Sequence, residues 1–124
     1  MHILVVEDNL INQIIITEIL TKTGINVTTK DNGLEALEVL EKEMFDLVLM
    51  DIQMPEMDGL TATVKIRENS KFDQMPILAM TAHSSEEHRR ESKESGMDAH
   101  LTKPIQVEEV YETLQYWRTH SRKG

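Results

Sequence analysis

Residues 45–51 read Phe-Asp-Leu-Val-Leu-Met-Asp, an apolar run that ends in an acid. The run is nearly continuous instead of alternating, which is typical of a strand covered on both faces in a parallel sheet. We therefore predict a strand over 45–50. Three further apolar runs each end at an acid, a hydroxyl or an ammonium: 3–6 before Glu7 and Asp8, 76–80 before Thr81, and 99–102 before Lys103.

Strand and helix patterns alternate along the whole chain. We predict strands over 2–6, 26–30, 45–50, 75–80 and 99–102, and helices over 10–23, 34–43, 60–69, 84–95 and 107–120. With short connections and right-handed crossovers, this pattern predicts a (βα)₅ doubly wound α/β fold with a parallel sheet. The flavodoxin-like strand order 2-1-3-4-5 is the common five-stranded solution.

Composition limits the classes of protein that this chain can represent. Its 124 residues indicate one domain over 1–124, and 40% hydrophobic residues argue against disorder. A formal charge of -9 argues against direct nucleic-acid binding. The absence of cysteine excludes disulfides and thiolate metal sites. No apolar run is long enough to span a membrane, so we expect a cytoplasmic domain without direct membrane contact.

The predicted topology brings the acids at the strand ends together. In the order 2-1-3-4-5 the first and third strands are neighbours, about 4.8 Å apart, so Asp8 and Asp51 face each other. Crowded carboxylates either share protons or hold a cation, and ligation by a few oxygen atoms suits Mg²⁺. We predict that Asp8 binds Mg²⁺ directly, Glu7 through water and Asp51 by one oxygen, with the Gln53 backbone carbonyl as a further ligand. The alternative is that Glu7 and Asp8 only stabilise the N-terminus of the following helix, which does not explain Asp51.

The same edge of the sheet carries residues of the types that phosphoryl transfer requires. An aspartate carboxylate can attack phosphorus, and Asp51 is the central acid. Phosphoryl transfer depends on neutralising charge on the equatorial oxygens. Lys103 and the Thr81 hydroxyl are the predicted partners of two of these oxygens, and Mg²⁺ is the partner of the third.

With these residues in place, the chain resembles a response-regulator receiver domain of two-component signalling over its whole length. The matching stretches are 3–9 (Ile-Leu-Val-Val-Glu-Asp-Asn), 50–59 (Met-Asp-Ile-Gln-Met-Pro-Glu-Met-Asp-Gly), 77–82 (Ile-Leu-Ala-Met-Thr-Ala) and 101–105 (Leu-Thr-Lys-Pro-Ile). The residues in these stretches most resemble those of receivers in hybrid histidine kinases and phosphorelays. The resemblance implies phosphorylation at Asp51, switch residues Thr81 and Lys103, and a cis Lys103-Pro104 bond.

The resemblance also implies partners and an output. Phosphoryl would come from phosphohistidine on a histidine kinase or a histidine-phosphotransfer domain, docked on the helix that follows Asn9. The output would be a shift of the surface formed by 84–95, 99–102 and 107–120, and a homodimer formed on activation is a further candidate assembly. Such a domain is a signalling module instead of a metabolic enzyme, although it catalyses its own phosphorylation and dephosphorylation.

Two histidines leave alternatives open. Receivers often carry Tyr or Phe three residues before the switch lysine, where this chain has His100. His100 either turns inward as that aromatic ring does, with pH dependence, or is a solvated side chain on the last strand. His83 either steers water near the aspartyl phosphate or is an ordinary loop residue.

Other functions of this fold would require residues that this sequence lacks. A magnesium-dependent phosphatase of the haloacid-dehalogenase type needs a second Asp two residues after the nucleophile, where this chain has Gln53. A flavodoxin needs a Ser/Thr/Gly-rich phosphate loop after the first strand, where this chain has acids. A pseudo-receiver that signals without phosphate is disfavoured by the complete set of site residues. The sequence leaves open whether the domain stands alone or belongs to a longer protein. Its resemblance to hybrid-kinase receivers favours a longer protein.

Overall fold

One parallel sheet forms the centre of the computed structural model, which describes residues 1–52, 54, 57–82 and 85–120. The five strands are β1 (His2–Val6), β2 (Asn26–Lys30), β3 (Leu47–Asp51), β4 (Ile77–Thr81) and β5 (Ala99–Thr102). Their order is β2-β1-β3-β4-β5, and every neighbouring pair is parallel. This confirms the predicted topology.

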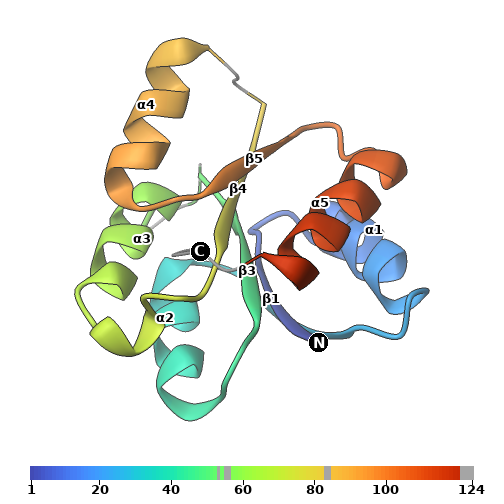
Figure 1. Ribbon diagram of the computed structural model, residues 1–124, viewed down its shortest axis with the longest axis horizontal. Coiled ribbons are helices and arrows are strands. Elements are labelled where there is room, and N and C mark those ends of the chain that lie inside the picture. Colours follow the sequence, from blue (N-terminus) through green and yellow to red (C-terminus); the bar gives the residue numbers. More distant parts are fainter. Residues whose placement is uncertain (53, 55–56, 83–84, 121–124) are drawn as a thin grey trace.

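Helices cover both faces of the sheet. They are α1 (Leu10–Thr21), α2 (Gly33–Lys42), α3 (Gly59–Arg67), α4 (Glu86–Ser95) and α5 (Val107–Thr119), with a short 3₁₀ helix η1 (Ser70–Phe72). Figure 1 shows α1 and α5 on one side of the sheet, and α2, α3 and α4 on the other. The molecule therefore has three layers, with the sheet between two layers of helices.

The core is divided by the sheet into two apolar clusters. Leu4, Val6 and Met50 face α2 and α3, whereas Ile3 and Leu49 face α1 and α5. All residues of β3 are buried. A strand enclosed on both faces gains from apolar side chains at every position, which explains the continuous apolar run that predicted β3.

Strand boundaries agree with the sequence prediction in part. The bounds of β1, β2 and β5 are as predicted, but β3 and β4 each begin two residues later and end one residue later. The parallel ladder extends to the pairs Asp51–Met80 and Thr81–Thr102, so Asp51 and Thr81 are the last residues of strands. Backbone hydrogen bonding of the sheet therefore holds both residues in place.

Helix α1 is shorter than predicted, and only part of its apolar surface packs on the sheet. It ends at Thr21 instead of Thr23, and Gly24, with φ of 82°, makes the turn into β2. Ile14 and Ile15 are exposed, whereas Ile16 and its apolar neighbours toward the C-terminus pack on the sheet. The apolar surface of α1 is thus wider than the area that the core covers.

Candidate functional site

The residues predicted at the strand ends line one cavity of about 320 Å³ at the carboxyl edge of the sheet. The lining consists of Glu7, Asp8, Asn9, Asn12, Asp51, Thr81, Ala82 and Lys103. β1 lies beside β3, β3 beside β4 and β4 beside β5, so parallel pairing brings their ends to one place. Gln53, the fourth predicted metal ligand, and His83 lie outside the described residues.

Three carboxylates form the acidic end of this cavity. Oxygen atoms of Glu7, Asp8 and Asp51 lie within 4.8 Å of one another. Glu7 is 1% exposed and Asp51 is 4% exposed, whereas Asp8 is exposed to solvent. The set offers hard oxygen ligands on a side open to water, and Mg²⁺ prefers such a site because it retains several of its waters.

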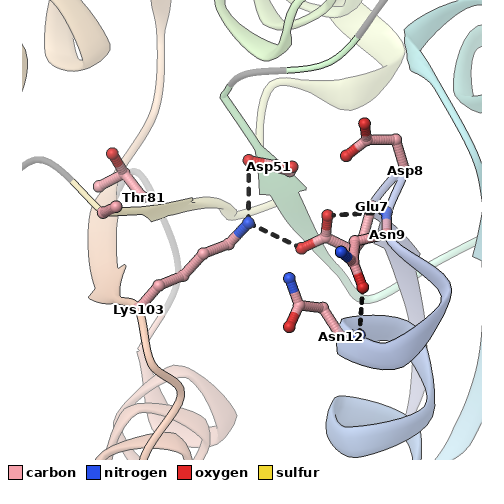
Figure 2. A pocket seen from close by; sticks show the side chains of 8 residues that line it. Glu7, Asp8, Asn9, Asn12, Asp51, Thr81 and Lys103 are labelled. Carbon is pink, nitrogen blue, oxygen red and sulfur yellow. Dashed lines mark hydrogen bonds and ion pairs between the residues drawn. The ribbon is translucent and has the colours of Figure 1, made fainter.

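Lys103 reaches into the acidic cluster from the end of β5. Its Nζ lies 2.9 Å from Glu7 Oε1 and 3.3 Å from Asp51 Oδ1 (Figure 2). Burial favours the neutral amine, but the contact with Glu7 and the two negative charges outweigh it and raise the pKa of Lys103. The ammonium therefore stays charged and bridges the two buried acids.

The two buried acids differ in how they hold protons. Burial raises the pKa of Asp51 first, and the neighbouring Glu7 raises it further, to about 7. Burial also acts on Glu7, but hydrogen bonds involving Asp51, Lys103 and the Asn9 N–H outweigh it and lower the pKa of Glu7. One ammonium therefore does not balance the carboxylates, and a divalent cation fits the charge of the cluster as well as its oxygen ligands.

Local structure around the cluster restrains the acids. The Asn9 side chain caps α1 by accepting from Asn12 N at 3.1 Å, and the Asn9 N–H donates to Glu7 Oε2 at 3.2 Å. After β3 the chain folds back tightly, because Gly59 N donates to Ile52 O at 2.8 Å. A Cβ atom at Gly59 would collide with the Asp51 carbonyl oxygen, so this close approach requires glycine.

Thr81 and the Lys103-Pro104 bond complete the predicted set. Thr81 is buried at the end of β4, and Figure 2 shows it on the other side of the Lys103 ammonium from Glu7. The Lys103-Pro104 peptide bond is cis, as the resemblance implied. Thr81, Lys103 and the acids thus surround the same space.

His100 is partly buried instead of solvated. It pairs with Ala79, which belongs to the apolar cluster on the α3 side, so its ring lies on the face that α4 covers. Its Nε2 atom is buried and has no hydrogen-bond partner in the described part of the chain. Burial, and then the charge of Arg89, lowers the pKa of His100, so the ring is neutral at pH 7. Its inward rotation stays a prediction.

Sequence reasoning missed Asn12 and Gln13. Asn12 lines the cavity, and the buried side chain of Gln13 donates to the Glu7 backbone carbonyl. Gln13 shares the spacing i, i+3, i+7 with the buried Ile16 and Leu20. A polar residue in an apolar helical stripe is the signal that could have identified it.

Comparisons with known proteins agree with this geometry. The family model described as "Response regulator receiver domain" matches residues 3–115. The sensor histidine kinase GacS of Pseudomonas protegens is 40% identical over 119 residues, covering 94% of this chain and 13% of the relative. The chain therefore spans only a small part of that curated relative's length.

Two solved structures that are similar to this chain contain receiver domains. The receiver domain of sensor histidine kinase PA1611 from Pseudomonas aeruginosa, with a magnesium ion coordinated in its active-site cleft, has a TM-score of 0.87 and 36% identity. The matched region covers 94% of this chain and 95% of that one. A Saccharomyces cerevisiae structure of the phosphotransfer protein Ypd1 with the Ssk1 receiver domain has a TM-score of 0.89 and 31% identity, covering 94% and 88%.

The family assignment agrees with the fold and with the strand-end residues. Within the described residues, no helix has the length and apolar character needed to cross a membrane. The family model covers most of the chain, and each of the three relatives is more than 30% identical. This chain belongs to the response regulator receiver domain family of two-component and phosphorelay signalling proteins.

Proposed function

We propose that the domain accepts a phosphoryl group from a phosphohistidine onto Asp51, at a site that binds Mg²⁺. The convergence of Glu7, Asp8, Asp51 and Lys103 at one cavity carries this proposal. Glu7, Asp8 and Asp51 would hold the ion, together with the backbone carbonyl of Gln53. The bound ion would supply positive charge beside the incoming phosphoryl group.

The chain's own residues account for the transfer step. The ionised Asp51 carboxylate forms the new oxygen–phosphorus bond while the phosphorus–nitrogen bond of the donor breaks, and that electron pair returns to the donor imidazole. Lys103 exchanges its contact with Asp51 for a phosphoryl oxygen, and the Thr81 hydroxyl donates to a second oxygen. Hydrolysis of the aspartyl phosphate at the same site would then reset the domain.

The exposed side of α1 is the proposed docking surface for the phosphodonor. Leu10 and Ile11 are 67% and 68% exposed, and Ile14 and Ile15 are 52% and 43% exposed. Contiguous exposed apolar side chains mark interaction surfaces, and this group lies directly beside the cavity. A histidine kinase or a histidine-phosphotransfer domain is the partner that we propose, by analogy with the Ypd1–Ssk1 complex.

Helix α4 is the proposed moving part of the output surface formed by α4, β5 and α5. Ser92 is its only buried residue, and α4 contributes no side chain to either apolar cluster of the described residues. An element held by so few apolar contacts shifts at low cost in free energy. Charge added at Asp51 would draw Lys103 and Thr81 and shift the population of α4 positions.

The setting of the domain is also a proposal. A hybrid histidine kinase is the longer protein that we propose for it, because the curated relative GacS is a sensor histidine kinase of which this domain spans 13%. The cytoplasm would then be its compartment. Homodimer formation on activation is a separate possibility, which sedimentation with and without beryllofluoride would test.

Chemical phosphorylation tests the site assignment. The domain is incubated with acetyl phosphate and Mg²⁺, and its intact mass is measured beside Asp51→Asn and the control Asp73→Asn, a carboxylate outside the cavity. We expect wild type and Asp73→Asn to gain one phosphoryl group that is stable in acid and labile in base. Equal labelling of Asp51→Asn would overturn the assignment of Asp51.

A further inference from the structure

Gln13 is a buried polar residue that the phosphoryl chemistry does not use. Its side chain is 7% exposed, within a helix stripe that is otherwise apolar. The Nε2 group donates to the Glu7 backbone carbonyl and, at 2.8 Å, to Asp31 Oδ1. Burying an amide costs free energy unless it is hydrogen-bonded, and both Nε2 hydrogens have an acceptor here.

The first acceptor places Gln13 behind the acidic cluster. The Glu7 carbonyl belongs to the peptide plane that joins Glu7 to Asp8, so holding this oxygen fixes the direction in which the Asp8 backbone leaves β1. The Glu7 N–H is also held, because it donates to Lys30 O at 3.0 Å. Together these bonds fix the backbone that carries two of the proposed metal ligands.

Gln13 also lies on the docking side of α1. A groove of about 370 Å³ between α1 and β2 is lined by Leu10, Gln13, Ile14, Thr17, Glu18, Val27 and Thr29. The exposed residues Leu10 and Ile14 of the proposed docking surface border this groove. One side chain therefore contacts both the groove and the peptide plane that presents Asp8.

We infer that Gln13 is a positioning residue that presents Asp8 to Mg²⁺ and links occupancy of the metal site to the α1–β2 groove. The inference rests on the proposed magnesium site and extends it. Ion binding would further restrain the Glu7–Asp8 peptide, and Gln13 would pass that restraint to the groove beside the proposed docking surface. Coupling of this kind is reciprocal, so a partner seated in the groove would also favour the ion.

Mg²⁺ titration of the intact chain tests the positioning role. Gln13→Met keeps the volume of the side chain but removes both hydrogen bonds, and loss of a residue that orients a metal ligand weakens metal affinity by about 10- to 100-fold. We expect that loss in calorimetric titration with Mg²⁺ alone. Gln115→Met, the same change on the exposed side of α5, should leave the affinity unchanged.

A second pair of variants keeps the test valid if Gln13→Met does not fold. Asp31→Asn retains an oxygen acceptor for Gln13 and should bind Mg²⁺ nearly as wild type does. Asp31→Ala removes the acceptor and should weaken binding by a few fold. An affinity within twofold of wild type for Asp31→Ala, or for a folded Gln13→Met, would overturn the positioning role.

Amide chemical shifts test the link to the groove. On Mg²⁺ addition, wild type should show shifts at Asp8 and also at Val27 and Thr29 in the groove. At saturating Mg²⁺, Gln13→Met should retain the shift at Asp8 and lose those in the groove. Equal groove shifts in both proteins would overturn the link. Labelling by acetyl phosphate at saturating Mg²⁺ reports separately on the proposed function, because that reaction depends on Asp51 and not on Gln13.

Discussion

Replacing Asp51 by Asn should stabilise the fold when Mg²⁺ is absent. Asp51 is 4% exposed, and burial together with Glu7 raises its pKa from 3.8 to about 7. An acid whose pKa is raised in the folded state contributes stability that is present below the unfolded pKa and is lost as pH rises through the folded pKa. Wild type therefore loses stability relative to Asp51→Asn between about pH 4 and pH 7.

The magnitude follows from the same pKa difference. Ionising Asp51 costs about 4 kcal/mol more in the folded domain than in the unfolded chain. The pKa of about 7 already includes the ion pair with Lys103 at 3.3 Å, so this difference is the net cost of the charge. We expect Asp51→Asn to be more stable than wild type by about 4 kcal/mol at pH 8, and by much less at pH 5.

Urea unfolding at pH 5 and pH 8 in the presence of EDTA measures this difference. Asp73→Asn, which changes a carboxylate outside the cavity, is the control for the loss of one carboxylate charge. Adding Mg²⁺ should stabilise wild type more than Asp51→Asn, because an ion that binds only the folded state stabilises it by mass action. Equal or lower stability of Asp51→Asn at pH 8 without Mg²⁺ would refute the reasoning about the buried acids.

Three further substitutions test separate parts of the structure. Lys103→Ala should retain Mg²⁺ binding but remove the activated shift of α4 and α5; an unchanged activated NMR spectrum would contradict the coupling. His100→Phe should be more stable than wild type below about pH 6.5, because the lowered pKa of His100 makes wild type lose stability as pH falls; parallel urea midpoints from pH 5 to pH 8 would argue against it. Gly59→Ala should destabilise the fold by about 2 kcal/mol or more, because its Cβ collides with the Asp51 carbonyl oxygen; an unchanged thermal midpoint would show that the loop adapts.

The positions of the strand-end residues could be predicted from sequence because all strands of a parallel sheet end at the same edge. Each strand ends at the same edge, so Asp8, Asp51, Thr81 and Lys103 could be placed together before any coordinates were known. The prediction required only strand order, which a few topological rules restrict. Their chemical roles still depend on the phosphorylation and metal-binding experiments.

The orientation of α1 and the role of Gln13 were not accessible in the same way. Apolar residues occur on several sides of α1, so periodicity alone did not show that Ile14 and Ile15 lie outside the core. The two acceptors of Gln13 lie 6 and 18 residues away in sequence, on the ends of different strands. Hydrogen bonds of this kind depend on exact side-chain placement, which a residue pattern does not encode.

The polar composition of α4 allows its outer surface to change without disturbing the core. The helix itself has almost no apolar surface to uncover when it moves, so its own side chains would add little to the patches that promote aggregation. Its outer residues can also be exchanged without removing any side chain from the two apolar clusters. If α4 carries the proposed output surface, partner choice there can change by surface substitution while the proposed phosphoryl site keeps its supporting core.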